Sequence, residues 1–400
     1  MVKVTASKAD IERMVAAGEW RREDLVRVLG TQDADAIETL RAAAEATLLA
    51  RVGAGVSLRG LIEFSNVCIS DCLYCGIRMH NRKVERYTLT DDEIVASARW
   101  CAEMGYGSVV LQSGERRDAR FIGRLVDNVR AIKEATRSER QPDGVGITLC
   151  VGEQSREDYQ RLFDAGAHRY LLRLETSSPE LFALIHPARQ RFETRLQCLK
   201  TLREVGFQVG TGVMIGIPGQ TLEQLADDLM LFRTLDIDMI GMGPYIPHAA
   251  AAMPADWPVA PVETRMDLAF KMIGLARLSL GDVNIAATTA LQALDPVGRE
   301  RGLRFGANVI MPQVTPLSVR KQYTLYDGKP CLEDSAGQCA TCLEGRIASV
   351  GRFIRYHSWG DSAHFARRND LPVELPQAPA VPRLPNVRAD KIIQLHLKQD

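Results

Sequence analysis

Residues 59–87 read RGLIEFSNVCISDCLYCGIRMHNRKVERY. The apolar run Leu61–Phe64 predicts a strand, which leads into three thiols spaced C-x3-C-x2-C. These thiols belong to Cys68, Cys72 and Cys75. Soft thiolates suit iron–sulfur centres, so three cysteines this close predict three corners of a cubane cluster. Because one of the four irons then has no protein ligand, a small molecule is predicted to bind at this open metal position.

A structural zinc site and chance clustering are the alternative interpretations. Zinc would want a fourth Cys or His close by, and His80 is available for that place. A ferredoxin-type carrier would need a fourth cysteine, and none lies near in the sequence. With Tyr74 just before the last cysteine, the spacing resembles that of the radical S-adenosylmethionine (SAM) enzymes. The resemblance implies that the unique iron chelates the amino and carboxylate groups of SAM, and that an electron from the cluster splits SAM to a 5′-deoxyadenosyl radical.

The composition is that of a globular protein with a large core, since 46% of the 400 residues are hydrophobic and 25% are charged. The 50 Lys and Arg residues balance the 50 Asp and Glu residues, so neither nucleic acid nor an anionic membrane surface is a predicted partner. No apolar run reaches the roughly 18 residues of a membrane span, and the N-terminal segment lacks the apolar core of a signal peptide. Of the nine cysteines, six lie in two metal-like groups, which favours a reducing, cytoplasmic location over a disulfide scaffold.

The order of the elements predicts an α/β fold, a complete (β/α)8 barrel of the TIM type with an N-terminal helical extension and a C-terminal iron–sulfur loop and tail. Apolar strands alternate with amphipathic helices, which implies a parallel sheet with right-handed crossovers. An open, partial barrel is the alternative. The expected strands are Leu58–Ser65, Ser108–Gln112, Gly146–Cys150, Arg169–Leu174, Gln208–Met214, Met239–Gly243, Asn284–Thr288 and Ala307–Met311. The expected helices between them are Asp91–Met104, Phe121–Ala135, Ser155–Ala165, Phe192–Val205, Leu222–Leu235, Val262–Leu278 and about Asp295–Gly302. The expected domains are a helical cap over 1–52, the barrel over 53–325, a loop with a second cysteine group over 326–368 and a Pro-rich tail over 369–400.

Polar residues that follow the apolar strands are expected to line a site, because the C-terminal ends of barrel strands carry it. The turn Gln112–Glu115, QSGE, leaves backbone groups bare at the mouth of the second strand. In radical SAM enzymes the corresponding turn binds the amino group of the SAM methionine. Glu175 follows the fourth strand, where it could accept hydrogen bonds from a ribose diol or pair with Arg173 or Arg195. Arg195 lies in a predicted helix, where a surface position is the default unless the helix N-terminus points into the barrel.

A second cysteine group has the spacing C-x7-C-x2-C in a polar, glycine-containing loop after the eighth strand. It comprises Cys331, Cys339 and Cys342. A second iron–sulfur cluster is the favoured interpretation, zinc is the runner-up, and free thiols come third. The remaining cysteines stand alone and are interpreted as buried, inert thiols; they are Cys101, Cys150 and Cys198.

Over about residues 10–365 the chain closely resembles the HydE family, the radical SAM maturases of FeFe-hydrogenase. The specific marks are IEFSNVC followed by CLYCG, VLQSGE, GAHRYLLRLET, IGMG before PYIPH, NIAATTA, GANVIMP and the second cysteine group. The resemblance implies a complete barrel that encloses cofactor and substrate, in which the first cysteine group ligates the SAM cluster and Tyr74 offers its backbone to the adenine. The residues implied to contact SAM are Gln112, Ser113, Glu175 and Arg195. The residues implied to line a substrate or anion pocket are Arg59, Arg169, Arg173, Met239, Thr288, Thr289, Tyr323 and Tyr326.

The implied pocket has a physical basis, because three arginines that point into a barrel need anions to pair with. The resemblance implies a substrate that supplies this charge, an iron(CO)2(CN)cysteine complex made by a partner maturase. The adenosyl radical is implied to attack the sulfur of this complex, and the product goes on to the two-iron subcluster of the hydrogenase. The implied cofactors are a 4Fe-4S cluster, SAM and a second cluster of the 2Fe-2S or 4Fe-4S type. The implied partners are the maturases HydG and HydF and a reductant such as ferredoxin or flavodoxin.

Two other functions fit parts of the same pattern. A mutase similar to methylornithine synthase would use the same cluster, SAM and arginine-lined pocket on an amino acid, but the second cysteine group argues against it. A non-catalytic iron–sulfur scaffold would neither bind nor cleave SAM. The chain also departs from the family at Leu174, where a histidine is usual, and at Arg116, where an acidic residue is common. Both positions are expected beside the cavity.

Overall fold

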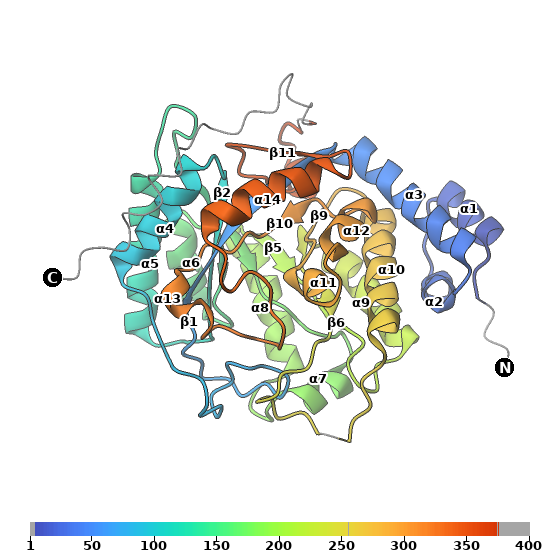
Figure 1. Cartoon of the computed structure of the whole chain (residues 1–400), viewed down its shortest axis with the longest axis horizontal. Helices are drawn as coiled ribbons and strands as arrows, with labels where there is room; N and C mark the ends of the chain where they lie inside the picture. The colour runs from blue at the N-terminus through green and yellow to red at the C-terminus, as the bar shows by residue number, and fades with distance from the viewer. Residues whose placement is uncertain (1–4, 255, 374, 376–400) are drawn as a thin grey trace.

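The structure is a computed structural model that describes residues 5–254, 256–373 and 375. In this part of the chain nine strands pair in parallel as one curled sheet (Figure 1). Eight of them follow the order β10-β1-β2-β3-β4-β5-β7-β9, and β11 (Phe353–Ile354) pairs with β1 outside this order. The end strands of this order meet through a parallel bridge between Ala286 and Val309. The predicted α/β fold with a barrel-type parallel sheet is confirmed. The strand bounds are β1 Gly55–Ser65, β2 Ser108–Ser113, β3 Gly146–Cys150, β4 Arg169–Leu171, β5 Gln208–Thr211, β7 Met239–Ile240, β9 Asn284–Ile285 and β10 Val309–Ile310.

Helices between the strands cover the outside of the sheet (Figure 1). Side-chain caps set where they begin: Thr90 and Glu93 form a capping box at α4, and Ser155 caps α6. The helices predicted from the sequence are α4 Asp91–Glu103, α5 Ala119–Ala135, α6 Arg156–Asp164, α8 Phe192–Val205, α9 Leu222–Thr234, α10 Val262–Leu280 and α12 Gly298–Arg304. The elements not predicted are α7 Pro179–Ile185, α11 Thr289–Leu294, α13 Leu317–Arg320, α14 Ala336–Ala348, α15 Ala363–Arg368, β6 Met214–Ile215, β8 Gly243–Pro244 and β11 Phe353–Ile354.

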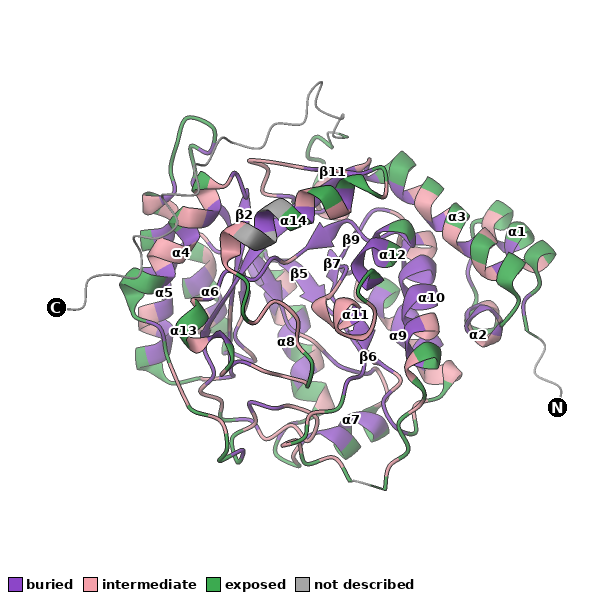
Figure 2. Cartoon of the chain, in the orientation of Figure 1, coloured by how far each residue is buried: buried purple, intermediate pink, exposed green. Residues whose placement is uncertain are grey.

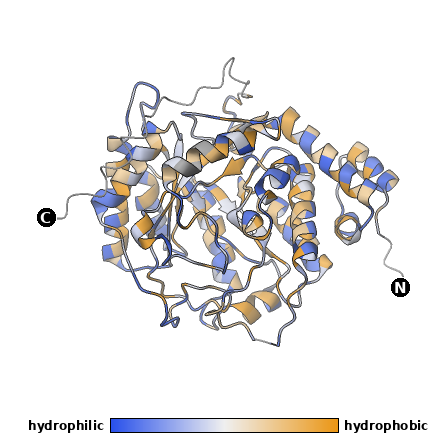
Figure 3. Ribbon diagram, in the orientation of Figure 1, coloured by the Kyte–Doolittle hydropathy of each residue, from blue (hydrophilic) through white to orange (hydrophobic). Residues whose placement is uncertain are grey.

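The apolar core lies between the sheet and these helices. Every residue of β1 is buried, and buried residues fill the centre of the molecule while the outer helix faces are exposed (Figure 2). Hydrophobic and hydrophilic residues alternate around the surrounding helices (Figure 3). Each large apolar side chain buried in this way contributes about 1.5–3 kcal/mol. The inward face of α5 shows the helical spacing: Phe121, Leu125, Val129 and Ile132.

Strand β4 is shorter than predicted. It ends at Leu171 rather than Leu174, and beyond it Glu175 forms an isolated parallel bridge with Val213. Glu175 has a positive φ of 69°, which no regular strand allows.

The predicted loop over 326–368 contains a helix, α14, which was not expected. Its residues Ala340, Leu343 and Ile347 are buried at helical spacing, and this apolar pattern indicates a helix in a segment whose cysteines and glycines favour a loop. The expected tail over 369–400 lies mostly outside the described residues.

The N-terminal region consists of helices α1, α2 and α3, which span Lys8–Ala17, Arg22–Gly30 and Ala34–Arg51. They pack on the barrel helices α9 and α10 (Figure 1). Arg22 of α2 is paired with Asp227 of α9 at 2.6 Å. Within the described ranges, none of the helices combines the length and the apolar character needed to cross a membrane.

Residues 357–362, termed the floor segment, close the N-terminal end of the barrel. The Gly360 carbonyl accepts a hydrogen bond from the buried Arg59 at 3.1 Å. Asp361 pairs with the guanidinium of Arg169, which is also buried. The floor segment thus supplies oxygen partners to two cations that would otherwise be buried alone.

Next to the floor segment, His364 lies between two carboxylates. Its ring nitrogens are 2.9 Å from Asp282 and 2.5 Å from Asp236. The hydrogen bond to Asp282, followed by that to Asp236, raises the pKa of His364 above its ordinary 6.5. A raised pKa stabilises the fold while the histidine is protonated, so this contribution is complete below the unfolded pKa and is lost as the pH rises through the folded pKa.

We therefore expect the free energy of unfolding to fall by about 1 kcal/mol as the pH rises above 6.5 through the raised pKa of His364. In the variant His364→Gln this part of the pH dependence should be absent. Urea unfolding of both proteins across a pH series measures the difference. Equal slopes in the two proteins would contradict the assignment.

Candidate functional site

A cavity of about 320 Å³, termed the chamber, lies at the C-terminal ends of the strands. It gathers residues from segments far apart in the chain, as a parallel barrel does at this end. Most of the residues expected to form the site line it: Cys68, Cys72, Tyr74, Cys75, Gln112, Ser113, Arg173, Glu175, Arg195, Thr288, Thr289, Tyr323 and Tyr326.

The first cysteine group lies on the loop that follows β1. The Ser70 N–H donates to the Cys68 sulfur at 3.3 Å, and the Ser70 hydroxyl donates to Gln190 at 2.9 Å. Burial raises the pKa of all three thiols, that of Cys72 to about 12. Thiols in such surroundings stay protonated until a metal binds them as thiolates.

The surroundings of His80 do not favour the zinc alternative. Its Nδ1 atom is 2.9 Å from Asp71, and 57% of its side chain is exposed. Among the described residues, no three His, Cys, Asp or Glu side chains are close enough to share one metal ion. A cubane cluster does not need that closeness, because each cysteine binds a different iron.

Gly114 allows the turn after β2 to lie directly against the cysteine loop. A Cβ at this position would be 2.5 Å from the Val67 carbonyl oxygen and 2.7 Å from the Cys68 Cβ, so a larger residue would push the two segments apart. Beside it, the Gln112 amide donates to the Tyr323 hydroxyl at 3.2 Å. The bare backbone of this turn therefore faces the same space as the three thiols, and the residues present fit a three-cysteine cluster with SAM.

Arg195 is a buried chamber residue rather than a surface arginine. It lies in the first turn of α8, which borders the chamber. Its Nε donates to Glu153 at 2.7 Å, and its Nη2 is 3.5 Å from Glu115. Burial alone would lower the pKa of Arg195, but Glu153 and Glu115 together raise it. The guanidinium is therefore a permanent cation in the chamber wall.

Glu175 and Arg173 form an ion pair on the chamber wall. The Arg173 Nη2 is 2.9 Å from one carboxylate oxygen, and its Nε is 3.0 Å from the other. Glu175 is 7% exposed and has the left-handed φ noted above, a conformation that is found mainly at functional positions. A carboxylate has about four lone-pair sites, so this one has room for two hydroxyl donors in addition to Arg173. The two interpretations of Glu175 are thus compatible.

The remaining predicted residues are held by single contacts. The Tyr74 hydroxyl is 3.2 Å from His186 Nε2, which anchors its ring on the segment after α7. The Thr288 hydroxyl donates to the Met242 carbonyl at 3.1 Å, and the Thr289 hydroxyl accepts from Arg299 at 3.0 Å. The predicted backbone contact of Tyr74 with adenine stays a prediction.

Glu63 and Lys329 are chamber residues that were not predicted from the sequence. Lys329 Nζ is 2.6 and 2.7 Å from the two carboxylate oxygens of Glu63, and it also donates to the Tyr323 carbonyl at 2.8 Å. Gln313 donates to the same carboxylate at 2.6 Å. Glu63 lies inside the apolar run LIEFS, and a carboxylate buried in such a strand needs a polar partner. This pattern could have indicated that Glu63 belongs to a site. Lys329 has no comparable sequence pattern.

Arg59, Arg169 and Met239 were expected in the substrate pocket, but none of the three lines the chamber. They lie at the opposite end of the barrel, where Arg59 contacts the Met239 sulfur and the floor segment. Arg169 donates to Thr148 at 2.9 Å in addition to its ion pair. Arg169 therefore has a carboxylate partner within the protein, whereas Arg59 has a carbonyl and a thioether, and neither arginine lines the chamber.

Three further residues differ from expectation. Leu174 is fully buried in the apolar core, and Arg116 pairs with Asp118 at 2.8 Å, so neither borders the chamber. Cys150 does line the chamber, whereas it was interpreted as an inert core thiol. Cys101 is buried as predicted.

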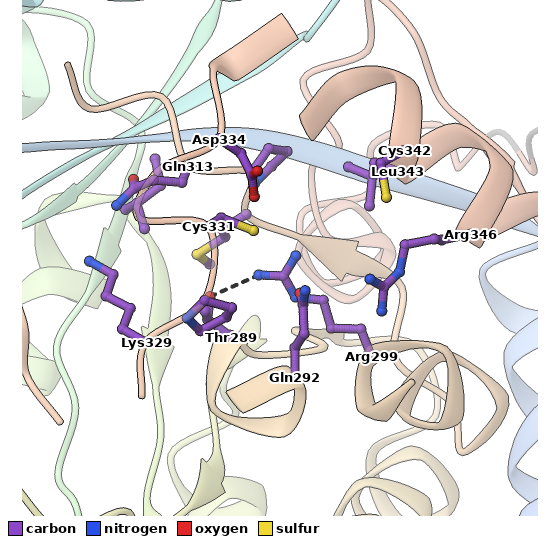
Figure 4. A pocket seen from close by; sticks show the side chains of 14 residues that line it. Thr289, Gln292, Arg299, Gln313, Lys329, Cys331, Asp334, Cys342, Leu343 and Arg346 are labelled. Atoms are coloured by element: carbon purple, nitrogen blue, oxygen red, sulfur yellow. Dashed lines mark hydrogen bonds between the residues drawn. The ribbon is translucent and has the colours of Figure 1, made fainter. Parts of the chain in front are cut away.

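A second cavity, of about 280 Å³, shares lining residues with the chamber. Figure 4 shows the side chains that line this second cavity. Two members of the second cysteine group line it, Cys331 from the segment before α14 and Cys342 from α14 itself. The side chain of the third member, Cys339, lies outside the described part of the chain. Both cavities are bounded by four shared residues: Leu61, Thr289, Met311 and Lys329.

Residues 62–232 match the family model of the Radical SAM superfamily. Over 336 residues, which are 84% of this chain and 92% of the relative, the sequence is 43% identical to the FeFe hydrogenase maturase subunit HydE of Thermotoga maritima. The crystal structure of methylornithine synthase (PylB) superposes with a TM-score of 0.73 at 22% identity, covering 87% of this chain and 98% of that one. The maturase HydG superposes with a TM-score of 0.73 at 18% identity, covering 88% and 78%. The two structures share the fold.

Proposed function

Because the chain belongs to the HydE family of radical SAM enzymes, which act in hydrogenase maturation, we propose that its chamber binds SAM and an iron(CO)2(CN)cysteine complex together. The supporting observation is that three cysteines, a glycine turn and three ion pairs line one cavity. A 4Fe-4S cluster on Cys68, Cys72 and Cys75 would supply the electron for reductive SAM cleavage. The 5′-deoxyadenosyl radical would attack the sulfur of the iron complex, and the product would go on to the two-iron subcluster of the hydrogenase.

The roles proposed for the protein's own residues follow from the contacts. The backbone carbonyls of Gln112 and Ser113, beside Gly114, would accept hydrogen bonds from the amino group of SAM. Glu175 would accept its ribose hydroxyls while Arg173 keeps the carboxylate charged. Arg195 would contact SAM from this end of the chamber, where Glu153 and Glu115 hold its guanidinium in position.

The barrel is proposed to be complete, closed through Ala286 and Val309, with the floor segment sealing its far end. A closed chamber would keep water away from a reactive centre. The second cysteine group is proposed to hold a second iron–sulfur cluster beside the chamber. The proposed partners are HydG, HydF and a reductant such as ferredoxin or flavodoxin, all in a reducing cytoplasm.

The test is anaerobic reconstitution with iron and sulfide, followed by reduction with excess SAM and chromatography of 5′-deoxyadenosine. We expect deoxyadenosine to form, and its yield to rise when the iron–cysteine complex is added. Stimulation by lysine instead would identify a mutase similar to methylornithine synthase. A fully loaded cluster that leaves SAM intact would contradict the proposed enzyme and leave the scaffold interpretation.

A further inference from the structure

Asp228 is a fully buried carboxylate on α9, outside the lining of the chamber. Its Oδ1 atom accepts a hydrogen bond from the Ser177 N–H at 2.6 Å, and its Oδ2 atom has no hydrogen-bond partner within the described residues. Every other buried carboxylate in the described part of the chain forms an ion pair with an arginine or a lysine. Asp228 is therefore set apart from these acidic residues by the lack of a cation.

The position of Asp228 on its helix is one that suits an apolar side chain. The same face of α9 buries Leu225 and Leu229, whereas the neighbouring Asp227 is paired at the surface. Burial raises the pKa of Asp228 to about 7, although Ser177 acts to lower it. A buried carboxylate without a cation is unfavourable, and an apolar residue of similar volume would pack here without that cost. Packing therefore does not account for Asp228, and its hydrogen bond to the backbone of another segment is the feature to explain.

That hydrogen bond holds one end of the turn that carries Glu175. At the other end, the Glu175 N–H donates to the Gly212 carbonyl and the Met214 N–H donates to the Glu175 carbonyl, each at 3.0 Å. Ser177 follows two residues later, just before α7, and is held there by Asp228. Glu175 keeps its left-handed φ of 69° between these two attachments. Such a conformation persists only where the surrounding structure enforces it.

We propose that Asp228 is a positioning residue for SAM, which holds the Glu175 carboxylate at the chamber wall through the Ser177 N–H. The proposal rests on the proposed function, in which Glu175 accepts the ribose hydroxyls of SAM. Because Asp228 does not line the chamber, its effect on the ligand passes through Glu175. Without this bond the turn is free to relax from the left-handed conformation, and the carboxylate moves away from the place where the hydroxyls bind.

The experiment is calorimetric titration of the full-length, cluster-loaded protein with SAM and without reductant, so that SAM binds but is not cleaved. Asp228→Ala is expected to raise the Kd for SAM about tenfold, the size of one lost hydrogen bond to a charged group. Asp228→Asn keeps an oxygen acceptor for the Ser177 N–H in the same shape, so its Kd should lie within about threefold of the wild type. Asp227→Ala is the matched control, because it removes an acidic side chain from the surface of the same helix.

A double-mutant cycle with Glu175→Ala shows whether Asp228 acts through Glu175. Glu175→Ala removes the proposed acceptor of the ribose hydroxyls and should raise the Kd about tenfold or more. The double variant should bind SAM no more weakly than Glu175→Ala alone, because no carboxylate is left to position. A role confined to support of the fold would lower the unfolding temperature of Asp228→Ala and leave the Kd of the folded protein unchanged.

Two results would overturn the role of Asp228: an unchanged Kd in Asp228→Ala, or additive weakening in the double variant. If Asp228→Ala does not fold, Asp228→Ser takes its place in the cycle, because its shorter side chain still fills part of the space with a polar group. A wild-type protein that does not bind SAM would contradict the proposed function, and the role of Asp228 with it. A wild-type protein that binds SAM while the cycle is additive would keep the proposed function and contradict the role of Asp228 alone.

Discussion

Replacing Cys72 with alanine is expected to abolish formation of 5′-deoxyadenosine. Cys72 is the proposed middle ligand of a three-cysteine set, so its loss would leave two thiolates for four irons. Removing even an outer partner of a metal ligand typically lowers affinity or activity 10–100-fold, so loss of a ligand should exceed about a hundredfold. The variant should also retain less iron and sulfide after reconstitution, which is measured by chemical analysis and by absorbance.

The matched control is Cys198→Ala. Cys198 is buried on α8 with a sulfur that is 3.9 Å from the Gln154 carbonyl, and it does not line the chamber. This variant should keep a full cluster and close to normal deoxyadenosine formation. If Cys72→Ala reconstituted and cleaved SAM like the control, the assignment of the cluster to the first cysteine group would be wrong.

The variant Arg195→Met is expected to lower the free energy of unfolding by about 3 kcal/mol. Methionine cannot pair with Glu115 and Glu153, which are 8% and 3% exposed and would keep their charges in a buried site. Arg117 still contacts both carboxylates at 2.6 Å, but 47% of its side chain is exposed. The expected loss is therefore near the lower end of the range for breaking a buried pair, and SAM affinity should fall as well.

Arg191→Met provides the comparison for that measurement. Arg191 precedes α8 and is 3.7 Å from Glu193, and both side chains are largely exposed. Exposed pairs contribute at most about 1 kcal/mol, so this variant should unfold close to the wild type in urea. A loss of less than about 1 kcal/mol in Arg195→Met would show that the chamber carboxylates do not depend on it.

The strand and helix order was predictable because each element has its own period. Apolar runs such as Gly146–Cys150 are buried on both faces, and helices such as Phe192–Val205 show apolar spacing of three and four. The first cysteine group was predictable for a chemical reason, since the spacing of its thiols in one loop already limits what they can bind. The polar residues at the C-terminal ends of the strands were predictable because barrel sites lie at that end of the sheet.

The depth of a side chain inside the barrel was not predictable in the same way. Alternation along a strand tells which residues point inward, but not toward which end their long side chains reach. Arg59 meets Gly360, a residue 301 positions away, and no local pattern encodes that contact. Lys329 was missed for the same reason, because its partner Glu63 lies 266 positions away in the sequence.

The floor segment also bears on the order in which the chain is completed during synthesis. Every strand in the described part of the chain precedes residues 357–362, so the ribosome completes the sheet before it makes the floor segment. Until then Arg59 and Arg169 have no carbonyl or carboxylate from the floor segment, and nothing from this segment covers the N-terminal end of the barrel. A chain that stops before residue 357 would therefore carry the first cysteine group and still lack the floor segment. A chain that extends through residue 362 joins the two buried guanidinium groups to the partners that the floor segment supplies.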